Sequence, residues 1–195
     1  MHCISINHQL LNGYLLTALQ AAVYQDGFRE QNRLKKHTGT VFDVAWSPDG
    51  EKIVSASGDG TIKLWNSNGK YIKDIISKSE NEFYSVSFSP DGEYIAFAED
   101  DTVKILNLQS EKPETLGEEE DKGLVWNVAW SPDGNIIATA NNGKIVRLWN
   151  KQGKLLEKPK DYKPLAKNAV AWNPKGNIIA TVSNDNSIKL KKQGN

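Results

Sequence analysis

A tetrapeptide of the form Ser-Pro-Asp-Gly recurs along this chain at a fixed spacing, and this repeat restricts the fold more than any other feature. Its prolines stand at positions 48, 90, 132 and 174, which are three steps of 42 residues, and the last copy reads Asn-Pro-Lys-Gly. A fixed period of this length is the signature of an architecture built by repeating one structural unit. We therefore expect four repeats, from about residue 37 to the end.

Each tetrapeptide has the composition of a type I turn, with a small polar residue first, proline second and glycine fourth. The flanking segments are rich in β-branched and aromatic residues, which favour strands. Upstream of the turns lie residues 41–46, 83–88, 125–130 and 168–172. Downstream, each repeat contains two strand-like segments, such as KIVSAS and then TIKLW in the first. A poorer fourth strand is predicted in three repeats, at residues 71–76, 114–116 and 154–159.

Four short antiparallel strands in about 42 residues are typical of one blade of a β-propeller. No helical segment lies between the strands, so a parallel βαβ arrangement is excluded. The segments HTGTVFDVAW (37–46) and GDGTIKLWN (58–66), together with the turns, resemble the tryptophan-aspartate (WD) repeat propellers. The resemblance implies an all-β fold, a β-propeller of four WD-type four-stranded blades that is either small or half of a larger ring.

The chain divides into a connector, residues 1–36, and a four-repeat array, residues 37–195. The expected repeats span approximately residues 37–78, 79–120, 121–162 and 163–195. In the connector, Leu11, Leu15 and Ala18 recur at helical spacing, which predicts an amphipathic helix over residues 9–24. Residues 22–39 resemble the connector that precedes WD arrays in large bacterial, particularly cyanobacterial, signalling proteins.

The last repeat lacks room for its outer strand, because the chain stops at Asn195 soon after the SIKL segment. Residues 31–36 immediately precede the first repeat, so they are placed to supply that strand. Such pairing would close the ring and cover an exposed sheet edge.

Four residues of the first repeat could be mistaken for a hydrolase site: His37, Ser55, Asp59 and Trp65. The WD resemblance implies instead that they form a structural tetrad, a hydrogen-bond chain from tryptophan to serine to histidine to aspartate. No nucleophile elbow or oxyanion loop accompanies the serine. We therefore expect no catalytic residue.

The other repeats are eroded at the tetrad positions. Steps of 42 from His37 reach Ser79, Asp121 and Lys163, so no other repeat keeps the histidine. The remaining positions are partly retained (Asp100, Thr139, Trp149, Thr181, Asp185) and partly replaced (Phe97, Leu106, Gly143, Lys191). We expect these blades to depend on apolar packing between sheets, which predicts modest stability.

A second series at the same spacing begins the innermost strand of each repeat: Phe42, Tyr84, Trp126 and Asn168. The WD resemblance places this position on the narrow face around the central channel, where partners commonly dock. Three aromatic residues in register predict an anchor patch for a partner, flanked by Thr40, Glu82 and Leu124. The alternative is that the rings only fill the centre of the propeller.

Composition removes several classes of function. The 195 residues carry 24 basic and 24 acidic side chains, so the excess of positive charge expected of a nucleic-acid binder is missing. A single cysteine excludes an intrachain disulfide framework and a thiolate metal cage. We expect no metal and no cofactor. The apolar stretch 10–23 is too short and too polar to span a membrane, and no signal peptide is evident, so we expect a cytoplasmic protein.

These observations predict a non-enzymatic scaffold or sensor module that binds protein partners. One alternative is a self-assembling half-propeller that functions as a homodimeric, eight-bladed ring, because propellers have roughly four to eight blades. Another is a binder of small ligands or glycans that uses the aromatic patch. Solution mass distinguishes the first alternative, and quenching of tryptophan fluorescence distinguishes the second.

Overall fold

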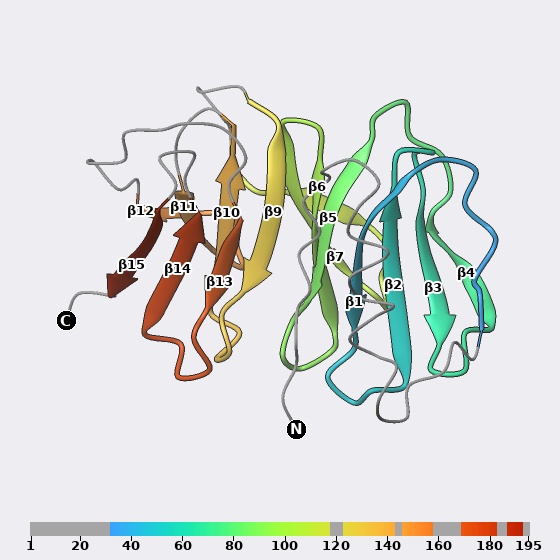
Figure 1. The fold of residues 1–195 in the computed structure, drawn as a ribbon, viewed down its shortest axis with the longest axis horizontal. Coiled ribbons are helices and arrows are strands. Elements are labelled where there is room, and N and C mark those ends of the chain that lie inside the picture. Colours follow the sequence, from blue (N-terminus) through green and yellow to red (C-terminus); the bar gives the residue numbers. More distant parts are fainter. Residues whose placement is uncertain (1–31, 118–122, 143–145, 158–168, 183–186, 193–195) are drawn as a thin grey trace.

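The computed structural model describes residues 32–117, 123–142, 146–157, 169–182 and 187–192. These residues form four antiparallel sheets, and each sheet is one repeat, here called a blade (Figure 1). Blade 1 comprises β1 (Val41–Trp46), β2 (Lys52–Ser57), β3 (Ile62–Asn66) and β4 (Tyr71–Ile76). Blade 2 comprises β5 (Phe83–Phe88), β6 (Tyr94–Glu99), β7 (Thr102–Asn107) and β8 (Pro113–Thr115). Blade 3 comprises β9 (Val125–Trp130), β10 (Ile136–Asn141), β11 (Val146–Asn150) and β12 (Leu155–Glu157). Blade 4 comprises β13 (Val170–Trp172), β14 (Ile178–Val182) and β15 (Ile188–Lys192).

The repeated tetrapeptides form the tight turns that the sequence predicts. In blade 1 the amide of Gly50 donates to the carbonyl of Ser47 at 2.9 Å, which closes the turn between β1 and β2. Gly50 has a φ of 74°, a conformation that glycine adopts without a steric penalty. The equivalent glycine-to-first-residue bond is also 2.9 Å in the other three blades.

The blades stack face to face through apolar side chains. We call the face of a blade that meets the preceding blade its front, and the opposite face its back. The back of blade 1 contributes Val54, Ala56, Ile62 and Leu64 to one buried cluster. The front of blade 2 completes this cluster with Phe83, Val86, Phe88, Ile95, Phe97 and Leu106. Two further clusters join blade 2 to blade 3 and blade 3 to blade 4 in the same way.

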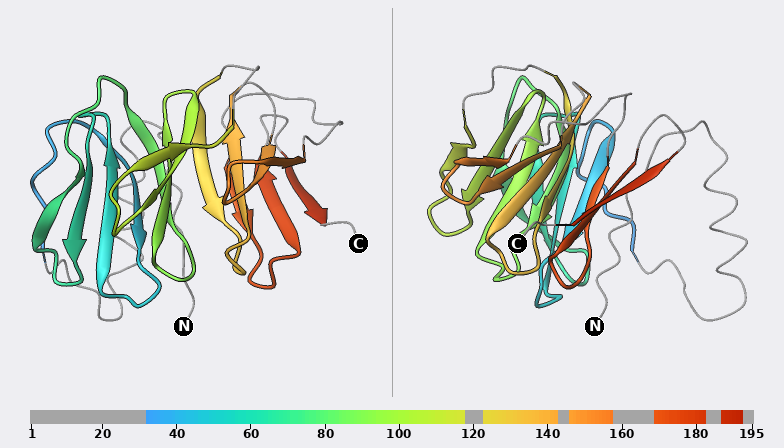
Figure 2. Two further views of the ribbon diagram at one scale, coloured as in Figure 1. Left: turned by 180° about the vertical axis from the view of Figure 1, so that it is seen from behind. Right: turned by 90° about the vertical axis from the view of Figure 1, so that its left-hand side faces the viewer.

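The four described sheets form an open array (Figure 1). Figures 1 and 2 show the four sheets side by side in sequence order, with blade 1 at one end and blade 4 at the other. On the front of blade 1, Val44 and Trp46 are 53% and 47% exposed, whereas the equivalent Val86 and Phe88 of blade 2 are 3% and 7% exposed. The predicted all-β fold of WD-type blades is confirmed, and among the described residues Val44 and Trp46 at one end of the stack and Ile188 and Leu190 at the other are exposed.

The described part of the predicted closing strand, residues 32–36, forms no strand. It runs beside blade 1, where the Asn32 side chain donates to the carbonyl of Asn68 at 2.8 Å and Lys36 lies 5.1 Å from the ring centre of Tyr71. The described sheet of blade 4 accordingly has three strands. Pairing of residues 31–36 with blade 4 therefore stays a prediction for an assembled ring. The predicted helix over residues 9–24 lies outside the described residues.

Candidate functional site

Three aromatic side chains at one end of the inner strands form a continuous row. We call Phe42, Tyr84 and Trp126 the aromatic row; each is the second residue of its strand, β1, β5 and β9. The ring centres of Phe42 and Tyr84 are 5.0 Å apart with a 39° angle between planes, and those of Tyr84 and Trp126 are 5.0 Å apart at 59°. All three side chains are partly exposed. The row therefore spans three blades and keeps a surface open to a partner.

The residues that flank the row are held by a repeated backbone bond. The carbonyls of Thr40, Glu82 and Leu124 accept from the amides of residues 58, 100 and 142 at 2.9, 3.1 and 2.9 Å. These bonds tie the entry to each inner strand to the turn after the second strand. Because both partners advance by 42 residues, each blade presents its aromatic residue from the same backbone frame. Asn168, the fourth member of the predicted patch, lies outside the described residues.

A carboxylate borders the centre of the row. The hydroxyl of Tyr84 donates to the Glu82 carboxylate at 2.6 Å. Burial and this hydrogen bond raise the pKa of Tyr84 above its usual value, so the hydroxyl stays protonated at neutral pH. The amide of Glu82 in turn donates to the side chain of Asp100 at 3.3 Å. The candidate binding face thus combines aromatic surface with acidic groups.

The structure brings the four predicted tetrad residues of blade 1 together. The Trp65 indole donates to the Ser55 hydroxyl at 2.9 Å, and this hydroxyl lies 2.7 Å from His37 Nε2. His37 Nδ1 lies 2.9 Å from the Asp59 carboxylate, and Thr61 adds a bond to Asp59 at 2.6 Å. This series of hydrogen bonds joins β3 to β2 and to the segment that enters the blade.

The Asp59 carboxylate is held in its charged form. Burial raises the pKa of Asp59, but the bonds from Thr61, the Thr38 amide and His37 outweigh that effect. The net result is a pKa well below the usual value for aspartate.

The order serine, histidine, aspartate is also that of a hydrolytic triad, but the surroundings of the serine differ. Ser55 is 6% exposed, and its oxygen already accepts the indole N–H of Trp65, which is itself 2% exposed. A nucleophilic serine needs room for a substrate carbonyl and a nearby oxyanion site. The enclosure of Ser55 supports a structural role.

Blades 2 and 3 replace the tetrad with smaller sets of bonds. In blade 2, Ser79 stands in the place of His37 and donates to the Glu99 carboxylate at 2.6 Å, and Lys104 forms an ion pair with the same carboxylate. In blade 3, the Trp149 indole donates to Thr139 at 3.0 Å. The blade 3 residues at the histidine and aspartate positions, 121 and 143, lie outside the described part of the chain.

Sequence reasoning missed a polar ladder beside the aromatic row. Asp43, Ser85 and Asn127 lie one residue after the three aromatics, and each accepts the amide of a valine in the next blade. These acceptors bind the amides of Val86, Val128 and Val170 at 3.0, 3.2 and 2.9 Å. The spacing of 42 residues between Asp43, Ser85 and Asn127 was the available signal in the sequence. Because the three residue types differ, their common role as acceptors of a backbone amide was not evident from the residue types alone.

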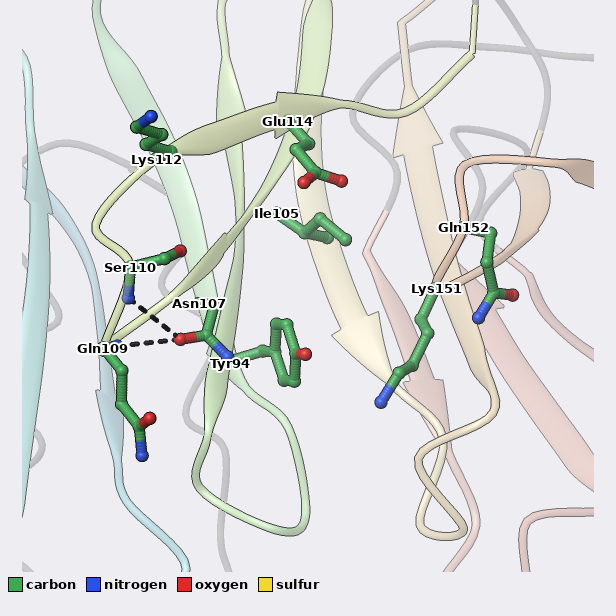
Figure 3. A pocket seen from close by; sticks show the side chains of 9 residues that line it. All are labelled: Tyr94, Ile105, Asn107, Gln109, Ser110, Lys112, Glu114, Lys151 and Gln152. Atoms are coloured by element: carbon green, nitrogen blue, oxygen red, sulfur yellow. Dashed lines mark hydrogen bonds between the residues drawn. The ribbon is translucent and has the colours of Figure 1, made fainter.

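A groove lies on the outer side of the stack, between blades 2 and 3 (Figure 3). Its volume is about 710 Å³, and its walls are the residues Tyr94, Ile105, Asn107, Gln109, Ser110, Lys112, Glu114, Lys151 and Gln152. The Lys151 ammonium lies 4.7 Å from the ring centre of Tyr94. A neighbouring groove of about 530 Å³ shares Lys151 and Gln152. Neither groove is lined by a member of the aromatic row.

The described residues contain neither a cluster of metal ligands nor a membrane-spanning helix. No group of three or more histidine, cysteine, aspartate or glutamate side chains there could hold a metal ion. The same part of the chain contains no helix of the length and apolarity needed to cross a membrane.

Comparison with known proteins identifies the family. Residues 28–66, 70–107, 112–150 and 165–190 match the WD40 family, described as WD domain, G-beta repeat. These segments cover more than half of the chain, which therefore belongs to the WD40 repeat family. Proteins of this family are in general non-catalytic scaffolds that mediate contacts between proteins.

Individual relatives match over short segments. The mRNA export factor of Xenopus tropicalis is 37% identical over 73 residues, which are 34% of this chain and 20% of the relative. Denticleless protein homolog A of Xenopus laevis is 45% identical over 49 residues, or 23% of this chain and 7% of the relative. Denticleless protein homolog B of Xenopus laevis is 60% identical over 30 residues, or 15% and 4%. The chain thus spans at most a fifth of the length of these relatives.

Proposed function

We propose that the chain is a protein-interaction module whose binding face is the aromatic row with Thr40, Glu82, Leu124 and Asn168. The observation that carries this proposal is the contact of three partly exposed rings from three blades, in one register. Tyrosine and tryptophan are enriched among the residues that dominate interface energetics. The repeated backbone bonds hold the rings in place before a partner arrives, which lowers the entropic cost of binding.

The same proposal assigns no catalytic residue and no cofactor to the chain. Ser55, His37 and Asp59 serve as a structural staple in this interpretation, because the hydroxyl of Ser55 is enclosed by Trp65. The equal numbers of acidic and basic side chains argue against a nucleic-acid partner. The proposed location is the cytoplasm, and the proposed setting is a bacterial signalling protein in which residues 1–36 connect the array at 37–195 to its context.

The test compares two variants as bait. The double variant Tyr84→Ser/Trp126→Ser removes most of the row, and Tyr94→Ser removes an aromatic residue from the outer groove, which the proposal does not use. Proteins captured by each bait are quantified by mass spectrometry, and the unfolding midpoint of each bait is measured in parallel. We expect the double variant to lose specific partners that the wild type and Tyr94→Ser both retain.

A core role for the row gives the opposite pattern. If capture is unchanged while the double variant unfolds at a clearly lower denaturant concentration, the rings serve packing and the proposal fails. The names of the relatives supply no partner for this test, because the matched segments cover at most a fifth of those proteins.

A second candidate function is self-assembly into a ring of two chains. It is favoured by the two uncovered ends of the array, where Trp46 at one end is 47% exposed and Leu190 at the other is 71% exposed. Large exposed apolar side chains on the outermost faces of a stack are typical of an incomplete assembly. Solution mass at twice 21.7 kDa is the expected result.

Glycan binding through the aromatic row is the weaker candidate. Sugar-binding sites combine an aromatic platform with a groove and several polar groups, and the two grooves described above are lined by other residues. A panel of oligosaccharides that leaves the tryptophan fluorescence unchanged at millimolar concentration would remove this candidate.

A further inference from the structure

We infer that the back of blade 4 in one copy of this chain packs on the front of blade 1 in a second copy, and reciprocally, so that two copies close one ring of eight blades. The inference rests on the second candidate function above and specifies its two surfaces. The inference does not depend on the aromatic row: if the row is not a binding face, the proposed ring of two copies is unaffected.

The repeat itself shows what covers such faces. At each of the three internal joints the front of a blade is covered by the back of the blade before it. The front positions Trp46, Phe88, Trp130 and Trp172 are equivalent, and Phe88 and Trp130 are both 7% exposed. Trp46 is 47% exposed because no preceding blade covers it in the described chain.

The back of blade 4 is the matching half of the same joint. Its residues Ile188 and Leu190 are each 71% exposed. Their equivalents in blade 3, Val146 and Leu148, are 3% and 6% exposed because blade 4 covers them. One unused front and one unused back therefore remain, and both carry the residue types that the chain already buries against each other three times.

The turns at the rim repeat this complementarity. A Cβ placed on Gly92 would lie 3.5 Å from Pro48 of the preceding blade, and one on Gly134 would lie 3.6 Å from Pro90. Gly50, the equivalent residue of blade 1, has no such neighbour within 4 Å among the described atoms. Pro174, in the turn of blade 4, is the equivalent of Pro48 and is the residue that would reach Gly50 of the second copy.

The backbone amide at the front of blade 1 does not oppose this contact. At each internal joint a side chain of one blade accepts the amide of a valine in the next, and at the end of the ladder Ala169 has no side chain that could do so. The corresponding amide, that of Val44, is already bonded to its own neighbour Asp43 at 2.8 Å. The joint between two copies thus buries apolar side chains without leaving this amide unpaired.

The number of copies follows from the known range of propeller sizes. Propellers close with roughly four to eight blades, and the single chain with four blades is open (Figure 1). Two copies supply eight blades, and a third would exceed the range. The two front-to-back joints of such a ring are related by a two-fold axis, and the ring closes without forming a filament only when eight blade-to-blade rotations complete one full turn.

Residues 32–36 complete the outer edge in this assembly. The edge of β15 has no fourth strand in the described sheet, and one repeat step back from residues 74–76 of β4 leads to residues 32–34. The segment of each copy that precedes blade 1 is therefore in register to pair with β15 of the other copy. Hydrogen exchange should show protection of β15 and of residues 32–36 that increases with protein concentration.

The main test is light scattering on the full chain and on single charge variants. Wild type should have twice 21.7 kDa. Trp46→Glu and Leu190→Glu should each be monomeric, with dimerisation weakened on the order of 100-fold or more, because an unpaired charge would be buried at both joints. Leu156→Glu is the matched control: Leu156 is an exposed leucine on β12 of an inner blade, 48% exposed, and its replacement should leave the dimer intact.

Mixing the two monomeric variants tests the polarity of the joint. A chain with Leu190→Glu keeps its front, and a chain with Trp46→Glu keeps its back, so an equimolar mixture should form a dimer through one intact joint. A wild-type monomer at micromolar concentration overturns the inference. So does a dimer that survives either charge variant alone, because in a front-to-back ring both surfaces take part in every joint.

Discussion

Blade 1 and blade 2 hold their strands together by different interactions. Blade 1 carries the complete hydrogen-bond chain from Trp65 through Ser55 and His37 to Asp59, yet Val44 and Trp46 on the inner strand of its front are exposed. Blade 2 has Phe97 at the serine position and Leu106 at the tryptophan position, with exposed fractions of 1% and 0%, and both of its faces are covered. Blade 1 therefore has the complete hydrogen-bonded tetrad, whereas blade 2 has apolar side chains at the serine and tryptophan positions.

The difference shows that a blade can be stabilised by hydrogen bonds within its own sheet or by apolar packing against a neighbouring blade. Inside blade 1, hydrogen bonds join β3 to β2 and to the segment that enters the blade. In blade 2 the same positions are apolar and contribute to a cluster shared with blade 1, in which Phe83 and Phe97 make an edge-to-face contact at 5.6 Å. The two blades thus use the same positions in different ways, with hydrogen bonds inside blade 1 and apolar packing between blades 1 and 2.

Removing a side chain that packs between blades 1 and 2 should lower the free energy of unfolding the most. Phe88→Ala should lower the free energy of unfolding by about 3–5 kcal/mol, because it opens a cavity at a fully packed joint. Trp46→Ala, at the equivalent position of blade 1, should cost about 1 kcal/mol in dilute protein, because half of that side chain is already exposed. Urea unfolding followed by circular dichroism measures both.

The concentration dependence sharpens this pair. The loss caused by Phe88→Ala should be the same at all protein concentrations, whereas that of Trp46→Ala should increase with concentration if Trp46 is buried between two copies. Equal losses for the two variants in dilute protein would show that the front of blade 1 is covered within a single chain.

Removing hydrogen bonds inside a blade should lower the free energy of unfolding by a smaller amount. Ser55→Ala removes the acceptor of the Trp65 indole and the partner of His37, so it should cost about 2 kcal/mol. Thr139→Val in blade 3 removes one bond, that from Trp149, and should cost about 1 kcal/mol. The ratio is read from the same urea titrations. Identical costs would mean that the histidine and aspartate add nothing to the staple.

The smallest expected effect concerns Asp59 and the way in which the free energy of unfolding depends on pH. The folded state lowers the pKa of Asp59 below its unfolded value of about 3.9, so the unfolded chain binds more protons in acid. The stabilisation is fully present above pH 5 and is lost as the pH falls through the unfolded and then the folded value. Asp59→Asn should therefore flatten the dependence of unfolding free energy on pH below about 5. An unchanged slope in this variant would exclude Asp59 as the source.

Much of the fold could be predicted from the spacing of prolines alone. Pro48 and its equivalents mark turns, turns mark strand ends, and a step of 42 residues leaves room for four short strands. The strand positions agree closely: the predicted segments 41–46, 83–88 and 125–130 are β1, β5 and β9. Local chemistry sufficed here because turn formation and strand propensity depend on neighbouring residues.

The candidate site could be predicted only in part from the sequence. The register of Phe42, Tyr84 and Trp126 was evident from their spacing, but the contact of their rings was not, because it depends on the distance between sheets. The ladder from Asp43 to Ser85 to Asn127 was missed, since a carboxylate, a hydroxyl and an amide look unrelated until their shared acceptor role is seen in space. The substitution of a Glu99 ion pair for the tetrad in blade 2 was equally hidden.

By itself, the sequence determined the repeat, the strands and the blade, because these follow from short-range turn chemistry and from the alternation of apolar residues. The arrangement of the blades in space was needed to show that the described sheets form an open array, that Trp46 and Leu190 are exposed at its two ends, and that residues 32–36 lie beside blade 1. The physical reason is that strand formation is local, whereas the covering of a face depends on which sheet stands next to it.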